Sequence, residues 1–183
     1  LPAYWFDKSQ TGGGVTLDLG CHGLYMLPYY CGKPKTITCR MEELYGTGSD
    51  ELSTTVMEFE NGATAVFTMT AFTKNTRRTI RVMGTLGELE GDSVKGTIEV
   101  KPFNSNEVET IDVSKQLVGH VGHAGGDTRL VDNIIDILRK DDLEHNLTSI
   151  DASVHSHVTA LAAEESRVNH GKSISIREFE SKF

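Results

Sequence analysis

Hydrophobic and polar positions follow two different periods along this chain, and the change of period predicts its elements. Between residues 35 and 113 several segments place an apolar residue at every second position, which is typical of β-strands. Before and after that region the apolar residues recur at every third or fourth position, which is typical of helices. The predicted order is a helix, a series of strands and two further helices.

Three helices are predicted from the helical spacing. The first runs from about Gly14 to about Leu27, and Pro28 should kink or end it because proline has no N–H for the helical ladder. One apolar face of this helix is expected to carry Val15, Leu19, His22 and Met26. The other two helices run from about Asp127 to Lys140 and from about Ser149 to His170, with Gly171 as a C-terminal stop.

The strands are predicted over seven segments, which are residues 35–44, 51–60, 63–73, 76–83, 87–90, 96–101 and 108–113. Asn61-Gly62 separates the second segment from the third and is a strong hairpin signal. The core face of the third segment is expected to hold Ala65, Phe67, Met69 and Ala71. The opposite face holds Thr64, Val66, Thr68 and Thr70, a composition suited to solvent or to a second subunit.

The predicted fold class is α+β, with a broad, open, mainly antiparallel sheet and helices packed on one face. Tight turns between consecutive strands favour antiparallel pairing. The chain of 183 residues shows no internal repeat, low-complexity tract or linker rich in proline or serine. We therefore expect a single domain over residues 1–183.

Charge and cysteine content narrow the partners and the compartment. The chain has 18 Lys and Arg against 26 Asp and Glu, a formal charge of −8, which argues against nucleic acid and anionic membranes as partners. No basic segment followed by an apolar run predicts a signal peptide or a membrane span. Three cysteines without a C-x-x-C motif favour a reducing, cytoplasmic setting.

The strongest chemical signal lies at the start of the first predicted helix, where Gly12-Gly13-Gly14 precedes Asp18 and His22. Residues four positions apart lie on the same face of a helix, so the carboxylate and the imidazole can point into one cavity. Such a pair can bind a substrate hydroxyl and move its proton. The alternative is a capped helix start with a hydrogen-bonded core histidine.

Two other segments are candidates for ligand contacts. The loop from Gly119 to Asp127 is rich in glycine and histidine, and it either lets a ligand approach backbone N–H groups or simply connects two elements. The indole of Trp5 can stack on a sugar ring or dock the N-terminal segment on the core. No histidine spacing matches a zinc motif, so no metal site is predicted.

The segment from Trp5 to His22, with the pattern W…GGG-x-x-x-D-x-x-x-H, resembles the opening of the C-terminal domain of the Gfo/Idh/MocA oxidoreductases, the relatives of glucose–fructose oxidoreductase and inositol dehydrogenase. Three further segments resemble motifs of that family in the same order. They are Glu58–Ala63 (a hairpin), Val82–Glu90 (G-T-x-G-x-L-E-like strands) and His123–Asp127 (H-x-G-G-D).

The resemblance implies a fold like the C-terminal domain of glyceraldehyde-3-phosphate dehydrogenase, with the free sheet face buried in a homodimer or homotetramer. It implies that Asp18 and His22 contact substrate and that His22 exchanges the hydroxyl proton during hydride transfer. His123 and Asp127 match positions near the substrate pocket of some members. Together with Trp5, these residues form the predicted substrate site.

The family's N-terminal Rossmann domain, which binds most of the NAD or NADP, has no counterpart in this sequence. Its catalytic lysine, in an E-K-P-like motif, is also missing, since Lys33-Pro34 and Lys101-Pro102 lie inside the matched region. The chain starts at Leu1 rather than Met, so it resembles the C-terminal piece of a longer enzyme.

The leading hypothesis is therefore the substrate-binding and oligomerisation domain of a cytoplasmic NAD(P)-dependent dehydrogenase. Its substrate would be a sugar, cyclitol or related polyol, and the isolated chain would be inactive. One alternative is a complete, free-standing binding or assembly module without catalysis. Another is a metal-dependent hydrolase that uses Asp18, His22 and the loop histidines.

Overall fold

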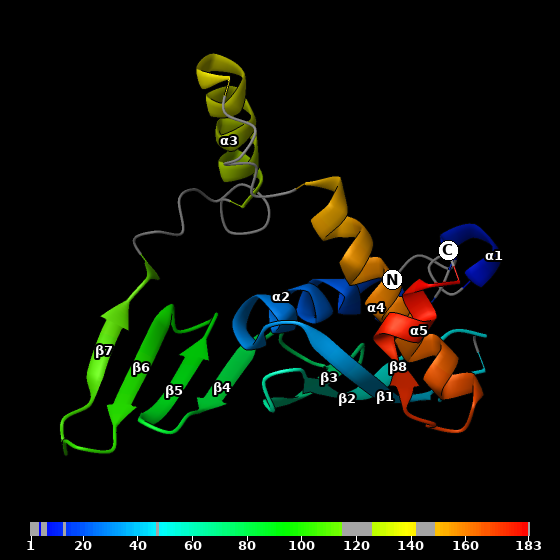
Figure 1. Ribbon diagram of the computed structural model, residues 1–183, viewed down its shortest axis with the longest axis horizontal. Helices are drawn as coiled ribbons and strands as arrows, with labels where there is room; N and C mark the ends of the chain where they lie inside the picture. Colours follow the sequence, from blue (N-terminus) through cyan, green and yellow to red (C-terminus); the bar gives the residue numbers. More distant parts are fainter. Residues whose placement is uncertain are drawn as a thin grey trace. The chain divides into compact units, whose positions relative to one another are not determined.

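The computed structural model describes residues 4, 7–12, 14–46, 48–114, 126–141 and 149–182. The chain divides into two compact units, the first formed by Leu1–Thr73 with Thr148–Phe183 and the second by Lys74–Leu147. Each unit contains one four-stranded antiparallel sheet (Figure 1). The α+β fold class predicted from the sequence is confirmed.

The first unit contains a sheet with the strand order β3-β2-β1-β8. Its strands are β1 (Pro34–Glu42), β2 (Leu52–Phe59), β3 (Thr64–Thr70) and β8 (Ile174–Ser175). Its helices are α1 (Lys8–Thr11), the π-helical turn η2 (Thr16–Gly20), α2 (Cys21–Cys31), α4 (Ile150–Val168) and α5 (Ile176–Glu180). Of these elements α1, β8 and α5 were not predicted, because short segments carry little periodic signal.

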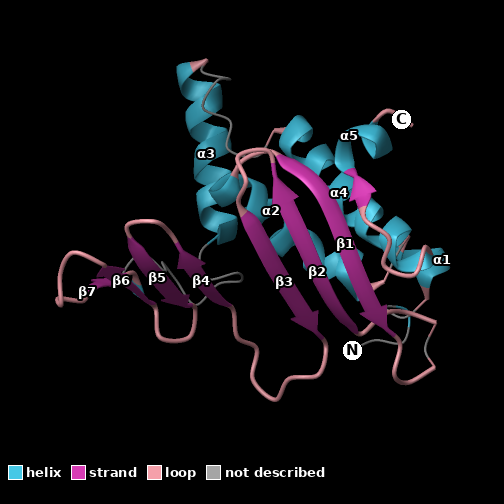
Figure 2. Cartoon of the chain, turned by 60° about the horizontal axis from the view of Figure 1, so that its bottom comes forward, coloured by secondary structure: helices cyan, strands magenta, loops and turns pink. Residues whose placement is uncertain are grey.

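Helices α2 and α4 cover one face of this first sheet, and no described element of the first unit covers the other face (Figure 2). Burial alternates along β2 as the period of a strand requires. The buried core holds Leu24 of α2 against Ile37 of β1 and Met57 of β2, with small residues of α4 completing the layer. In β3 the side chains of Ala65, Phe67 and Met69 are half-buried and those of the threonines are exposed, so the predicted faces are confirmed.

The predicted hairpin joins β2 to β3. Gly62 adopts a φ of 86°, a left-handed conformation that favours glycine. Its N–H donates to the carbonyl oxygen of Phe59 at 3.0 Å, and the N–H of Ala63 donates to Asn61 Oδ1 at 3.0 Å. The local Asn-Gly signal was therefore enough to place the reversal of the chain.

The first long helix differs from its prediction in two ways. The fully buried positions are Val15, Thr16, Gly20 and Leu24, whereas Leu19, His22 and Met26 of the expected apolar face are exposed. The reason is the π turn η2, which takes one residue more per hydrogen-bonded turn than an α-helix and so shifts the buried face by one position. The helix also continues past Pro28 to Cys31 and stops at Gly32, which has a φ of 88°.

The second unit contains a sheet with the strand order β4-β5-β6-β7. Its elements are β4 (Thr79–Met83), β5 (Gly87–Asp92), β6 (Thr97–Pro102), β7 (Glu109–Asp112) and the helix α3 (Gly126–Lys140). The expected single broad sheet is wrong for the described strands, which pair as two separate sheets. Residues 71–78 between β3 and β4 form no strand, so no tight turn continues the ladder there.

Helix α3 matches the predicted span within one residue, with Asp127 in its first turn and Arg139 and Lys140 in its last. That charge order suits the helix dipole. Its apolar side chains at helical spacing are exposed, and they are Leu130, Val131, Ile134, Ile135 and Leu138.

Candidate functional site

Asp18 and His22 lie on one continuous helical segment of the first unit. Asp18 belongs to the π turn η2, and His22 is the second residue of α2. Both side chains are exposed. In the described part of the chain no hydrogen bond or ion pair joins the carboxylate to the imidazole. The predicted pair is therefore accessible to a ligand, and its two members are not bonded to each other in this structure.

The opposite side of the same segment packs closely on the first sheet. A Cβ atom added at Gly23 would lie 2.2 Å from Cε2 of Phe67 on β3, and one added at Gly20 would lie 3.6 Å from Cε1 of the same ring. A side chain at position 23 would therefore clash with the ring unless Phe67 moved, whereas the distance at Gly20 is an ordinary van der Waals contact. This contact fixes which side of the segment faces the sheet and leaves Asp18 and His22 exposed.

Cys21 lies between the two candidate residues and is half-buried. Its thiol donates to the carbonyl oxygen of Asp18 at 3.1 Å. Burial raises the pKa of the Cys21 thiol, and the negative charge of Asp18 raises it further. Because the thiolate is the reactive form, Cys21 is a poor nucleophile and a poor metal ligand at neutral pH.

Of the other predicted substrate residues, Asp127 is the one that lies within the described ranges. Asp127 is exposed in the first turn of α3, in the second unit. Trp5 and His123 lie outside the described residues, as do the other histidine and most of the glycines of the loop. Within the described ranges no three His, Cys, Asp or Glu side chains come close enough to hold a metal ion.

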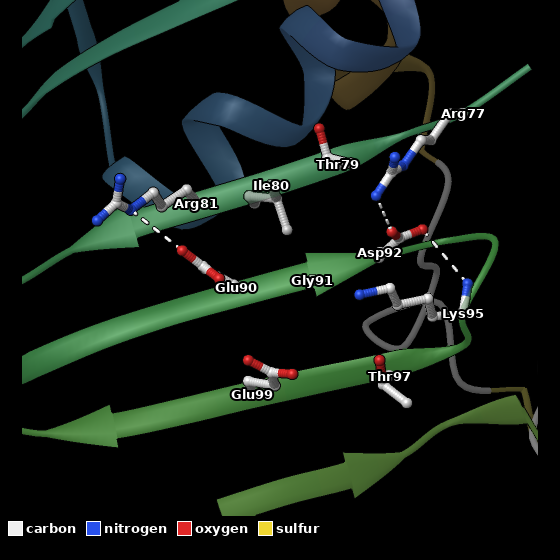
Figure 3. Close-up of a pocket in the computed structure, with 10 residues that line it drawn as sticks. All are labelled: Arg77, Thr79, Ile80, Arg81, Glu90, Gly91, Asp92, Lys95, Thr97 and Glu99. Carbon is white, nitrogen blue, oxygen red and sulfur yellow. Dashed lines mark hydrogen bonds and ion pairs between the residues drawn. The ribbon is translucent and has the colours of Figure 1, made fainter. Parts of the chain in front are cut away.

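A cavity of about 260 Å³ lies on the polar face of the second sheet (Figure 3). Arg77 pairs with Asp92 across it, and Arg81 pairs with Glu90, with Nε 3.4 Å from Oε1. The cationic lining residues are Arg77, Arg81 and Lys95, and the anionic ones are Glu90, Asp92 and Glu99. Three cationic and three anionic side chains line the cavity, and four of them are held in the ion pairs Arg77–Asp92 and Arg81–Glu90.

Sequence reasoning missed Asp50, the buried residue that holds the start of the helix carrying Asp18 and His22. The available signal was the run of three glycines, because glycine is typical of a backbone position that another group approaches closely. It did not indicate which residue approaches, because Asp50 is 34 positions away from its partner Thr16.

The fold and the site define a class of protein. The chain has an α+β fold, and it exposes an aspartate and a histidine on its first long helical segment. Residues 1–90 match the family model described as the GFO/IDH/MocA C-terminal domain. The resemblance predicted from the sequence is therefore confirmed over this part of the chain. No curated protein sequence matches the chain significantly.

Solved structures of similar fold come from several bacteria. An NAD-binding oxidoreductase from Klebsiella pneumoniae superposes with a TM-score of 0.80 at 18% identity, over 94% of this chain and 53% of its own. An oxidoreductase from Agrobacterium radiobacter, in complex with NAD+, L-tartaric acid and magnesium, superposes with a TM-score of 0.75 at 21% identity. The match covers 88% of this chain and 48% of that protein. An inositol dehydrogenase homologue from Azotobacter vinelandii, complexed with NADH and myo-inositol, superposes with a TM-score of 0.70 at 18% identity. The match covers 86% of this chain and 48% of that protein.

The chain therefore spans about half the length of these solved proteins. At such low identity the likeness shows the fold. Among the described helices, none combines the length and the apolar character that a membrane crossing requires.

Proposed function

We propose that this chain is the substrate-binding and oligomerisation domain of a longer NAD(P)-dependent oxidoreductase. The reaction is hydride transfer between a C–OH group and nicotinamide, and the substrate is a sugar, cyclitol or related polyol. The observation that carries the proposal is the joint exposure of Asp18 and His22 on a helix of a GFO/IDH/MocA C-terminal domain.

The chemistry needs both kinds of side chain. Oxidation of an alcohol removes a hydride from carbon and a proton from oxygen, and the cofactor accepts only the hydride. A histidine titrates near neutral pH and can take that proton. A carboxylate exposed on the same helical segment can accept a hydrogen bond from a substrate hydroxyl and so orient the substrate. His22 is therefore assigned the proton transfer, and Asp18 the binding and orientation.

The substrate class and the cofactor rest on related folds. The Azotobacter homologue is complexed with NADH and myo-inositol, and the Klebsiella protein is described as NAD-binding. Trp5, His123 and Asp127 complete the proposed substrate site. NAD or NADP binds mainly to an N-terminal Rossmann domain of the parent protein, and the location is proposed to be cytoplasmic.

The proposal predicts a clear difference between the full-length parent protein and the 183-residue chain. With NAD+ or NADP+ and a panel of polyols that includes myo-inositol, the parent should reduce the nicotinamide with saturable dependence on one polyol. The chain alone should give no turnover, because most of the cofactor site is elsewhere. Absorbance of the reduced nicotinamide measures both.

Two results would contradict this proposal. One is polyol-dependent turnover by the chain alone. The other is a parent protein that reduces neither cofactor with any sugar or polyol of the panel. Reactions without polyol serve as the control for background reduction.

The open face of the first sheet is the proposed interface between copies. Its exposed side chains are Thr54, Val56, Glu58, Thr64, Val66, Thr68 and Thr70. Short polar and β-branched side chains on an uncovered sheet suit association with a second copy of the same face. Dimer or tetramer formation would bury Val66, which is 66% exposed in this chain.

Light scattering tests this interface. The unmodified chain is expected to exceed its monomer mass of 20.1 kDa, and Val66→Glu is expected to be monomeric because it buries a charge in the interface. Val94→Glu is the matched control, since Val94 is 68% exposed in the second unit. A monomeric unmodified chain at high concentration, or a Val66→Glu variant of unchanged mass, argues against the interface.

A further inference from the structure

A buried carboxylate holds the start of the helical segment that carries Asp18 and His22. Asp50 precedes β2 and is only 4% exposed. Its Oδ2 accepts a hydrogen bond of 2.8 Å from the N–H of Thr16, the first residue of η2. Val15, the residue before that turn, offers no side-chain cap. Asp50 therefore supplies from a distant part of the chain the acceptor that an N-cap residue normally provides.

Gly14 provides the space for this carboxylate. A Cβ atom added at Gly14 would lie 1.5 Å from Asp50 Oδ1 and 2.6 Å from its Cγ. Any other residue at this position would displace the carboxylate, because the two groups cannot occupy the same volume. The last glycine of the run thus has a specific steric role, which is to admit Asp50 to the helix start.

The electrostatic setting suits a buried negative charge. The N-terminus of a helix carries a partial positive charge, which stabilises an anion placed there. On α4, the pKa of Arg167 is raised, first by its hydrogen bond to Glu164 and more weakly by the charge of Asp50. Arg167 is therefore a cation on α4 that interacts with the Asp50 carboxylate.

The anchored backbone leads directly to the candidate pair. The carbonyl oxygen of Gly14 accepts hydrogen bonds from the N–H groups of Leu17 at 3.0 Å and Asp18 at 3.2 Å. Gly14 and Thr16, which Asp50 contacts, are therefore part of the same turn as Asp18. His22 follows one turn later on the continuous segment.

We infer that Asp50 is a positioning residue for the Asp18–His22 pair, acting through the backbone of Thr16 and the space at Gly14. This inference rests on the proposed function for its catalytic consequence. The positioning itself is a property of the chain and is measurable without substrate. Asp50 is too deeply buried to touch a ligand, so its effect on catalysis must pass through the helix.

A neighbouring residue provides a matched control. Glu51 is 1% exposed, but its Oε2 accepts from the N–H of Leu44 at 2.7 Å and from that of Tyr45 at 3.3 Å. These partners lie in the connection between β1 and β2, away from the helix start in the sequence. Glu51→Ala therefore removes a similarly buried carboxylate and leaves the acceptor of the Thr16 N–H in place.

Hydrogen exchange in the 183-residue chain tests the positioning. Asp50→Ala should speed exchange of the Thr16 and Asp18 amides about tenfold relative to the rest of the first unit, because a lost helix cap frees the first turn. In Asp50→Asn the exchange rates of these two amides should stay within about threefold of those in the unmodified chain, since the amide oxygen still accepts a hydrogen bond from the Thr16 N–H. Glu51→Ala should leave the exchange of these two amides unchanged.

Gly14→Ala tests the same contact by filling the space that the Asp50 carboxylate occupies. If Asp50→Ala does not fold, amide exchange in Gly14→Ala decides whether this contact holds the helix start. Gly14→Ala should reproduce the faster exchange. Adding Asp50→Ala to Gly14→Ala should then change little, because both substitutions remove one interaction. Additive effects, or an Asp50→Ala exchange rate equal to that of the unmodified chain, overturn the inference.

Kinetics of the parent protein with its oxidised polyol test the catalytic consequence. Asp50→Ala should lower kcat about tenfold with little change in KM, because a displaced pair loses reaction geometry rather than affinity. Asp50→Asn should restore most of kcat, and Glu51→Ala should lower the melting temperature but not kcat. An equal fall in kcat for Glu51→Ala overturns the catalytic role. A parent without polyol turnover overturns the proposed function, and hydrogen exchange still decides the positioning.

Discussion

Substitution of His22 by alanine is expected to lower the turnover of the full-length parent protein about 100-fold or more, the usual loss when a general acid–base is removed. The imidazole is exposed, so the protein should stay folded. Asp18→Asn should also reduce turnover, since the amide keeps the shape of the carboxylate but not its charge. Initial rates with saturating nicotinamide and polyol measure both variants.

Met26→Ala is the matched control for this experiment. Met26 lies one turn beyond His22 on α2 and is 40% exposed, but it has no group that can exchange a proton. It should keep a near-normal rate. If His22→Ala also keeps a near-normal rate, His22 has no part in proton transfer and the assignment of the pair fails.

Leu24→Ala is expected to destabilise the chain by about 2–5 kcal/mol, the range for a large aliphatic side chain removed from a packed core. Leu24 has no exposed surface and lies in the cluster with Ile37, Met57 and Phe59. The free energy of unfolding from denaturant titration measures the loss.

The same Met26→Ala variant serves as the control here, with an expected change within about 0.5 kcal/mol for a surface substitution. The comparison separates burial from helix propensity, because both substitutions introduce alanine into α2. A loss below about 1 kcal/mol for Leu24→Ala would contradict the buried face described for this helix.

Strand positions were predictable from local pattern. The alternation in β3 and the Asn61-Gly62 turn depend only on residues within a few positions, and both are confirmed. Each strand boundary in the first hairpin is within about three residues of its prediction. The division of the strands into two sheets was not predictable, because periodicity within a strand does not specify which strands pair.

The first helix shows where local pattern misleads. A period of 3.6 placed Leu19 and His22 on the buried face, but the π turn η2 moved burial to Gly20 and Leu24. Gly20 and Gly23 face Phe67 of β3, a residue more than 40 positions away. Glycine contributes no hydrophobic signal, so the side of the helix that contacts the sheet could not be read from its own residues.

By itself, the amino-acid sequence determined the alternating strands, the hairpin, the two later helices and the spacing of Asp18 and His22, because these depend on neighbours along the chain. Tertiary structure alone decided that both of these side chains are exposed and that Asp50 enters the space at Gly14 to hold Thr16. Such contacts join residues far apart in the chain, and they form only when the helix packs on the sheet.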